Sequence, residues 1–189
     1  MIVYCGTSNR GKLREFQLAA PDLEIRAVDA PPPEEHGSSF EETARSKAAY
    51  YAGFAPGWVF ADDSGLEVDA LGGEPGVHSA RYAGPDADDA RNNALLLERL
   101  RGVDKPSARF VCVIALAHGG VVERTFRGVV EGRIIDSPRG ENGFGYDPLF
   151  YYDLFGCTFG EASDAQKMQV SHRAQALQAM FDYLRRASR

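Results

Sequence analysis

The sequence has little of what nucleic-acid binding, membrane insertion or a disulfide framework requires. Its 189 residues carry 21 lysines and arginines against 27 aspartates and glutamates, a formal net charge of −6, which argues against a broad nucleic-acid-binding face. Its 3 cysteines lack metal-ligand spacing, and an odd number is a poor disulfide framework. Because no charged leader is followed by a long apolar run, we expect neither export nor membrane spanning, and we expect a cytoplasmic protein.

The composition that remains is that of an ordinary globular protein. Hydrophobic residues make up 44% and charged residues 25% of the chain, which suffices for one large domain or for two lobes sharing a core. Cys5 and Cys112 lie inside apolar runs, so we expect buried free thiols. The acidic net charge does not exclude a small anionic ligand, since local lysines and backbone amides can bind phosphate.

The order of apolar runs and breakers predicts an α/β fold with a mixed sheet. Ile2–Cys5 reads as a buried strand, Gly6–Gly11 as a polar turn, and Lys12–Ala20 as a helix ended by Pro21. Strand, turn and helix in this order aim backbone N–H groups at an anion.

The rest of the chain continues this pattern. The other expected elements are a loop over Pro31–Gly37, a helix capped by Ser39 that runs to about Tyr51, a strand over Trp58–Ala61 that ends at Asp62–Gly65, a helix over Asp86–Leu100, a hairpin of Arg109–Ala117 and Val121–Ile135 turning at Gly119-Gly120, a glycine-rich loop over Gly140–Asp147, and a last helix capped by Ser171.

The first chemically informative segment is the polar turn Thr7–Lys12. Its small and amide side chains allow backbone N–H groups to approach an oxyanion, and Lys12 adds a mobile positive charge. The alternative is a helix cap followed by a solvated lysine.

Acidic residues form the second and third segments. Asp62 and Asp63 repel each other, and such a pair is stable when a cation or hydrogen-bond donors lie opposite. Mg²⁺ is a hard cation that prefers carboxylate oxygen, and water and substrate phosphates complete its coordination sphere. Glu34 and Glu35 are a second carboxylate source, with Lys47 one helix segment later; the alternatives are an aspartate-rich turn and an exposed acidic loop.

Two later segments offer contacts for a flat base. In Gly143–Pro148, glycines on both sides of Phe144 leave its ring open for stacking, and Asp147 could accept a hydrogen bond from a base edge. Lys167 and Ser171–Arg173 add donors near a helix start. The alternatives are a turn with a core aromatic and a polar helix entry.

Taken together in their order, these motifs resemble the inosine triphosphate pyrophosphatase family, also called Ham1-like. The resemblance covers the chain from end to end. The matching motifs are Thr7–Lys12, Phe40–Ala44 with Lys47, Ala61–Leu66, Gly72–Gly76, Ser79–Tyr82, Phe144–Pro148 and Ser171–Arg173.

The resemblance implies an elongated, two-lobed α/β fold around a long mixed sheet, with the active site in the cleft between the lobes and usually a homodimer. It also implies Mg²⁺-dependent hydrolysis of abnormal purine nucleoside triphosphates (ITP, dITP and XTP) to the monophosphate and pyrophosphate, which cleanses the nucleotide pool.

The resemblance also assigns roles to residues. Asp63 would be the general base and a metal ligand, with Asp62 beside it; the upstream metal ligand would be Glu34 or Glu35, and we favour Glu34. Ser8 stands where many members have glycine, and a serine still allows a tight turn. The phosphate-binding residues would be Thr7, Ser8, Asn9, Arg10, Gly11, Lys12 and Lys47. The other substrate-binding residues would be Ser64, Phe144, Gly145, Tyr146, Asp147, Lys167, His172 and Arg173.

Two rival functions fit parts of this pattern. Maf-like nucleotide pyrophosphatases share the cleavage but act on modified or pyrimidine nucleotides, and Phe144–Asp147 with Ser171–Arg173 favours the purine branch. A nucleotide-sensing module would keep the pocket without the chemistry, and the retention of Asp62 and Asp63 beside Lys12 speaks against it.

Overall fold

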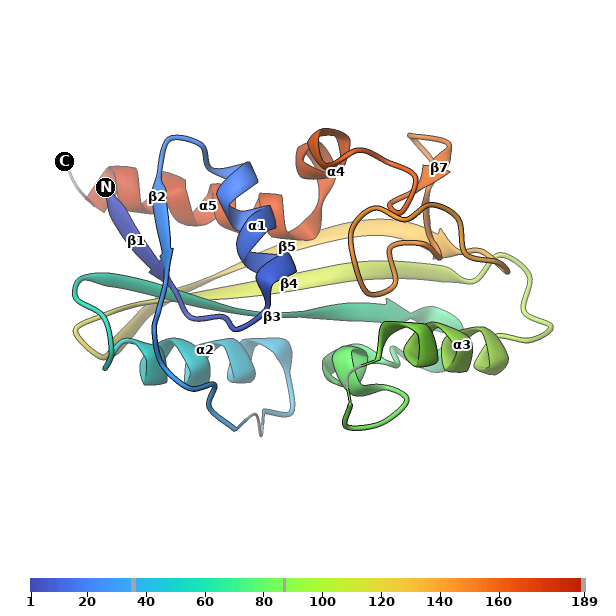
Figure 1. Ribbon diagram of the computed structural model, residues 1–189, viewed down its shortest axis with the longest axis horizontal. Coiled ribbons are helices and arrows are strands. Elements are labelled where there is room, and N and C mark those ends of the chain that lie inside the picture. The colour runs from blue at the N-terminus through green and yellow to red at the C-terminus, as the bar shows by residue number, and fades with distance from the viewer. Residues whose placement is uncertain (35–36, 87, 188–189) are drawn as a thin grey trace. The chain divides into compact units, whose positions relative to one another are not determined.

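The computed structural model describes residues 1–34, 37–86 and 88–187, and within them it confirms an α/β fold with a mixed sheet (Figure 1). The seven-stranded sheet has the order β2-β1-β3-β4-β5-β6-β7. β1 runs parallel to β2 and β3, whereas β6 runs antiparallel to β5 and β7. The strands are β1 (Ile2–Cys5), β2 (Glu24–Ala27), β3 (Trp58–Val68), β4 (Ser107–His118), β5 (Val121–Ile134), β6 (Phe150–Tyr152) and β7 (Cys157–Thr158). The α-helices are α1 (Arg10–Ala19), α2 (Phe40–Tyr51), α3 (Asp89–Arg99), α4 (Asp164–Val170) and α5 (His172–Ala187), with short 3-10 helices η1 (Asp69–Leu71) and η2 (Gly76–Arg81).

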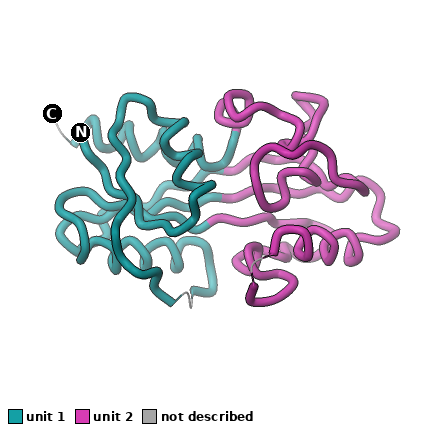
Figure 2. The backbone as a smooth tube through the Cα atoms, viewed as in Figure 1, with its two compact units in different colours: residues 1–63, 112–128, 171–189 teal, residues 64–111, 129–170 magenta. Residues whose placement is uncertain are grey.

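The chain divides into two compact units (Figure 2). Unit 1 comprises Met1–Asp63, Cys112–Gly128 and Ser171–Arg189, and unit 2 comprises Ser64–Val111 and Val129–Val170. The chain passes from one unit to the other within β3, β4 and β5. No helix in the described part of the chain is both long and apolar enough to cross a membrane.

Unit 1 has its own apolar core between the sheet and helices α1 and α5. Phe16 of α1 meets Phe60 of β3 edge to face, with ring centroids 5.2 Å apart. Leu177, Phe181 and Leu184 of α5 are buried in the same core. Burial of these faces fixes α1 and α5, and both helices carry predicted site residues.

Unit 2 is built around a separate aromatic core. The ring centroid of Phe110 on β4 lies 4.5 Å from that of Phe150, and Phe159 lies 5.0 Å from Phe150. Leu96 of α3 and Leu66 of β3 are fully buried in the same cluster. This core holds α3 on the sheet.

Several local predictions are confirmed. Ser39 caps α2, since its hydroxyl accepts a hydrogen bond from the Glu42 N–H at 3.2 Å. Ser171 likewise caps α5, accepting from the Ala174 N–H at 3.2 Å. Strand Ile2–Cys5 and the hairpin of β4 and β5 are present, and Cys5 and Cys112 are buried free thiols.

Several element boundaries are wrong in the sequence prediction. Helix α1 begins at Arg10 rather than Lys12, so the last residues of the predicted turn lie in its first turn. The strand expected to end at Ala61 continues to Val68, so Asp62 and Asp63 lie inside β3 rather than in a turn. A charge can remain inside a buried strand when an opposite charge compensates it, and Lys12 does so for Asp62. Helix α3 begins at Asp89, not three residues earlier, because the residue before it caps the first turn. The predicted loop over Pro31–Gly37 is irregular where it is described, and residues 35–36 lie outside the described residues.

The N-terminus of α5 lies directly on β5 at Gly128. A Cβ atom built on Gly128 would lie 2.0 Å from the His172 carbonyl oxygen and 2.8 Å from the Ala176 nitrogen, and both are backbone atoms. Only a residue without a side chain allows this approach.

We therefore predict that Gly128→Ala lowers the free energy of unfolding by at least about 2 kcal/mol, because α5 must move to make room. Urea unfolding measures the loss. Gly53→Ala is the control, since its Cβ would meet the Tyr50 carbonyl oxygen at 3.4 Å. Equal stability of the two variants would show that the close approach is absent.

Candidate functional site

The predicted phosphate-binding turn joins β1 to α1 in unit 1. Asn9 caps the helix, and its side chain accepts a hydrogen bond from the Lys12 N–H at 3.0 Å. The Asn9 N–H in turn donates to the Thr7 hydroxyl oxygen at 3.1 Å. Ser8, Asn9 and Arg10 are exposed, so an anion can reach the N-terminal end of α1, where backbone N–H groups and the helix dipole favour negative charge.

Lys12 and Asp62 form a buried ion pair. The Lys12 Nζ lies 2.9 Å from Asp62 Oδ2, and the Asp62 side chain is completely inaccessible to solvent. The second oxygen, Oδ1, accepts no hydrogen bond from the residues that the structure describes. Asp62 is therefore stabilised mainly by the positive charges near it.

Those charges come from three helices of unit 1. Burial alone would raise the pKa of Asp62, but the charges of Lys12, Lys47 and Arg173 outweigh it and lower the pKa below its usual value. Lys47 lies on α2 and is 8% exposed, and Arg173 at the start of α5 is 6% exposed. The structure thus brings together three cationic residues that the sequence analysis assigned to substrate binding.

Glu15 is a member of this cluster that the sequence analysis missed. It lies on α1, it is buried, and its Oε2 accepts a hydrogen bond from Arg173 Nη1 at 2.7 Å. Burial would lower the pKa of Arg173, but Glu15 and Asp62 raise it. The signal in the sequence was an acidic residue next to the core residue Phe16, but its partner lies 158 positions away.

Asp63 follows Asp62 on β3 and is 8% exposed. Successive side chains of a strand point to opposite faces of the sheet, so these two carboxylates do not face one ion together. Asp62 pairs with Lys12, and which of the two carboxylates would hold a metal ion stays a prediction. Glu34 is exposed, Glu35 lies outside the described residues, and the described residues contain no group of three acidic, histidine or cysteine ligands.

His172 and Arg173 occupy the first turn of α5, as predicted. His172 is 1% exposed, and the buried Ser171 caps the helix through its hydroxyl. The close approach of β5 at Gly128 holds this turn in place. Both predicted donors are therefore buried and rigidly supported.

The second group of predicted site residues lies in unit 2, in the loop between β5 and β6. Asp147 is 2% exposed, and its Oδ2 accepts a hydrogen bond from the Phe144 N–H at 2.9 Å. The same oxygen accepts from the ammonium of Lys167 on α4. Lys167 Nζ lies 5.3 Å from the ring centroid of Phe144, within cation–π range. Asp147 thus orders the loop and Lys167, and its contact with a base stays a prediction.

Tyr146 belongs to the core of unit 2. Its ring is 4% exposed, and its hydroxyl donates to the Ser79 carbonyl oxygen at 2.7 Å. Burial raises the pKa of Tyr146, so the hydroxyl stays protonated and keeps this hydrogen bond. Its side chain anchors the loop. Phe144, by contrast, is only half-buried, and Ser64 lies on β3 where that strand enters unit 2.

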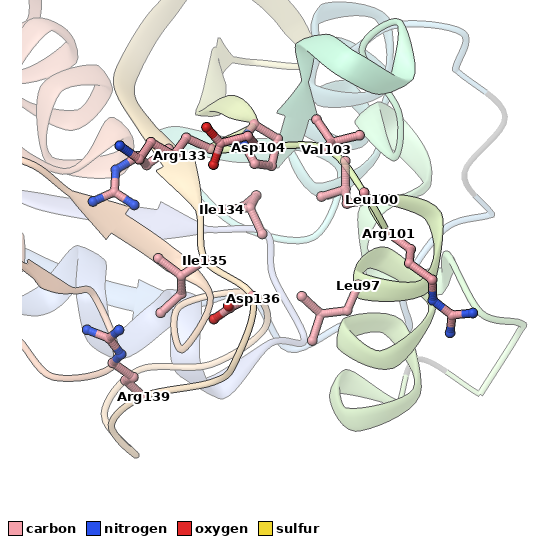
Figure 3. Close-up of a pocket in the computed structure, with 13 residues that line it drawn as sticks. Leu97, Leu100, Arg101, Val103, Asp104, Arg133, Ile134, Ile135, Asp136 and Arg139 are labelled. Carbon is pink, nitrogen blue, oxygen red and sulfur yellow. The ribbon is translucent and has the colours of Figure 1, made fainter.

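A cavity of about 520 Å³ in unit 2 does not coincide with these residues (Figure 3). Its apolar wall includes Leu97, Leu100, Ile134 and Ile135, and none of the predicted site residues lines it. Arg101 points away from the cavity in Figure 3. The cavity therefore does not identify the candidate site, which rests on the two groups described above.

The chain is similar to several known proteins over almost its whole length. Residues 3–183 match the model of the Ham1 family. A dITP/XTP pyrophosphatase of Syntrophobacter fumaroxidans is 50% identical over 182 residues, covering 93% of this chain and 78% of the relative. Another, from Exiguobacterium sp., is 47% identical over 186 residues, covering 95% of both. The solved Staphylococcus aureus Ham1 protein is 40% identical, with a TM-score of 0.85 and 98% of both chains covered.

The pKa of Asp62 gives a testable pH dependence. Because the folded-state pKa lies below the unfolded value of about 3.9, Asp62 contributes stability above pH 3.9, and this contribution is lost as the pH falls through the folded pKa. We predict that Asp62→Asn costs about 3 kcal/mol at pH 7, since it removes the anion that Lys12 faces. The difference from the parent should shrink below about pH 4.

Urea unfolding at a series of pH values between 7 and 3 measures both quantities. Asp22→Asn, at an exposed turn, is the control and should match the parent within about 0.5 kcal/mol throughout. An Asp62→Asn deficit that stays constant with pH would contradict a lowered pKa at Asp62.

Proposed function

The chain belongs to the Ham1 family, and from this we propose that it is a nucleoside triphosphate pyrophosphatase acting on dITP, ITP and XTP. Hydrolysis gives the nucleoside monophosphate and pyrophosphate, and so removes abnormal purine nucleotides from the nucleotide pool. Proteins 50% and 47% identical to this chain carry the name dITP/XTP pyrophosphatase.

The observation that carries the proposal is the set of cations around Asp62. Lys12 pairs with this buried carboxylate at 2.9 Å, beside the exposed N-terminal end of α1, and the charges of Lys47 and Arg173 also lower its pKa. Buried cations whose positions are already fixed need no reorganisation when a charged substrate binds, so they suit a triphosphate. We assign Lys12 and Lys47, with the backbone N–H groups of Thr7–Gly11, to the phosphates.

Mg²⁺ is part of the proposal because the donor set fits it. One or two carboxylates together with substrate phosphates are enough for Mg²⁺, and it does not need an all-protein cage. Asp63 and Glu34 would hold the ion. When bound, it would neutralise triphosphate charge and make the α-phosphorus more electrophilic.

Asp63 is the proposed general base. Its carboxylate would accept a proton from a water molecule while the water oxygen forms a bond to the α-phosphorus. The bond from that phosphorus to the oxygen bridging it to the β-phosphorus breaks, and pyrophosphate leaves with the electron pair. Lys12 and Lys47 stabilise the charge that develops on the leaving group.

Recognition of the base is assigned to Phe144, through stacking, and to His172 and Arg173, as donors toward an oxygen at C6. Hypoxanthine and xanthine carry that oxygen, whereas adenine carries an amino group there. The amino group is itself a donor, so it would face the donors of His172 and Arg173 without an acceptor between them. Each unpaired buried polar group costs about 1–3 kcal/mol. Asp147 is the proposed acceptor at the N1 edge, where adenine has no hydrogen, and the two mismatches together give roughly 10²- to 10⁴-fold discrimination. Glu15, which holds Arg173 at 2.7 Å, would fix the direction of that donor.

The first test measures pyrophosphate release from dITP, XTP and dATP with Mg²⁺ and with EDTA. We expect kcat/KM for dITP and XTP to exceed that for dATP at least about 10²-fold, and activity to disappear with EDTA. Preference for a pyrimidine nucleotide would indicate the Maf-like alternative. Nucleotide binding without any turnover would indicate a sensing module.

The second test is Asp63→Asn. Loss of the base and metal ligand should lower kcat at least about 10²-fold while dITP binding largely remains. Glu67→Gln is a matched control on the same strand, where the Glu67 carboxylate lies 3.7 Å from Arg109. Turnover of Asp63→Asn within threefold of the parent would move the base to another residue.

We also propose that the protein is a cytoplasmic homodimer, as the family resemblance implies. The buried free thiols Cys5 and Cys112 are compatible with a reducing compartment. Sedimentation velocity at micromolar concentration tests the dimer, and a single species at the monomer mass would contradict it.

A further inference from the structure

Two side chains of helix α3 form hydrogen bonds to the backbone of Gly145, one to its N–H and one to its carbonyl oxygen. Asp89 Oδ2 accepts a hydrogen bond from the Gly145 N–H at 2.7 Å, and Asn93 Nδ2 donates to the Gly145 carbonyl oxygen at 3.0 Å. Asp89 and Asn93 are four positions apart, so they lie on the same face of α3. One helix face thus contacts both peptide groups that flank Gly145.

Fixing both of these peptide groups fixes the two backbone torsions of Gly145. Its φ is +64°, in the left-handed region that favours glycine, and a Cβ built there would meet no heavy atom within 4 Å. Packing does not restrain that side of the residue. The hydrogen bonds from α3 therefore restrain a residue that would otherwise have wide conformational freedom.

Gly145 lies between Tyr146, which is buried, and Phe144, whose ring is half-buried. On one side, Tyr146 is fixed in the core through its hydrogen bond to Ser79. On the other side, Phe144 is connected to the loop by its N–H, which donates to Asp147. Rotation at Gly145 would shift the Phe144 ring while the core stays intact.

The Gly145 carbonyl oxygen sets the orientation of the Asn93 side-chain amide. Because a carbonyl oxygen can only accept, the Asn93 Nδ2 must face Gly145, at 3.0 Å, and Oδ1 is directed elsewhere. The described residues offer Oδ1 no hydrogen bond, so within them the hydrogen bond of this amide is the one to Gly145. The contact therefore points to a positional role for Asn93.

We propose that Asp89 and Asn93 are positioning residues that set the Phe144 ring for stacking on the purine base. The proposal rests on the proposed function, in which Phe144 stacks on the base. Neither residue touches the substrate; both act through the backbone of Gly145.

The test measures KM and kcat for dITP in the Asp89→Ala and Asn93→Ala variants. We expect KM to rise about 5- to 30-fold and kcat to change less than threefold, because stacking contributes equally to the ground state and the transition state. The inhibition constant of tripolyphosphate, which has no base, should stay within twofold. Unchanged KM values would overturn the proposal, as would an equal loss of tripolyphosphate inhibition.

Conservative variants separate positioning from folding. Asp89→Asn keeps an acceptor for the Gly145 N–H, so its KM should return to within about threefold of the parent. Asn93→Asp keeps the shape but turns an acceptor toward the Gly145 carbonyl oxygen, so its KM should rise at least as much as that of Asn93→Ala. The opposite order of these two variants would contradict the mechanism, even if an alanine variant fails to fold.

Asn92→Ala is the matched control on the same helix. Asn92 also makes two backbone hydrogen bonds, donating to the Ala80 carbonyl oxygen at 3.0 Å and accepting from the Ala83 N–H at 2.8 Å. It does not contact Gly145. The control should lose stability in urea unfolding but keep the parent KM. If Asn92→Ala raised KM as much as Asn93→Ala, the effect of Asn93 would come from general destabilisation of the protein.

Phe144→Ala distinguishes failure of this inference from failure of the proposed function. A raised KM for Phe144→Ala with normal KM values for the Asp89 and Asn93 variants would refute only the positioning role. An unchanged KM for Phe144→Ala would refute base stacking itself, and the positioning role with it.

Discussion

The buried carboxylate of Asp62 constrains the arrangement of unit 1. An ionised group without solvent contact is stable only when opposite charges compensate it, and here Lys12, Lys47 and Arg173 do so from α1, α2 and α5. Each of the three helices thus carries a cation whose charge stabilises this carboxylate of β3. Glu15 of α1 fixes the guanidinium of Arg173 in addition, because it accepts a hydrogen bond from it. The position of each cation thus depends on a carboxylate that the substrate has no need to touch.

The same constraint prepares the protein for its chemistry. Cations fixed by a buried acid cannot collapse onto surface carboxylates, so they stay directed toward an incoming triphosphate. Asp63 follows Asp62 on the same strand, its side chain points to the opposite face of the sheet, and it is the carboxylate proposed to act on water. In unit 2, Asp147 orders Lys167 through a buried side-chain ion pair, and α3 orders Gly145 through hydrogen bonds to its backbone.

Local features could be predicted from the sequence because their causes are local. Caps at Ser39 and Ser171 depend on neighbours within three residues, and the hairpin of β4 and β5 on its turn. The predicted strand end at Asp62 and Asp63 is wrong, because the charge that compensates Asp62 comes from Lys12 on α1, far away in the sequence. Glu15 and Asn93 were missed for the same reason, since their partners lie 158 and 52 positions away.

The measurement that tests the central claim most directly is hydrolysis of dITP in ¹⁸O-enriched water, with the products separated and analysed by mass spectrometry. Attack of water on the α-phosphorus, with pyrophosphate as the leaving group, puts the label in deoxyinosine monophosphate and none in pyrophosphate. Label in pyrophosphate, or release of orthophosphate with the diphosphate as the other product, would show a different bond being cleaved and would contradict the account.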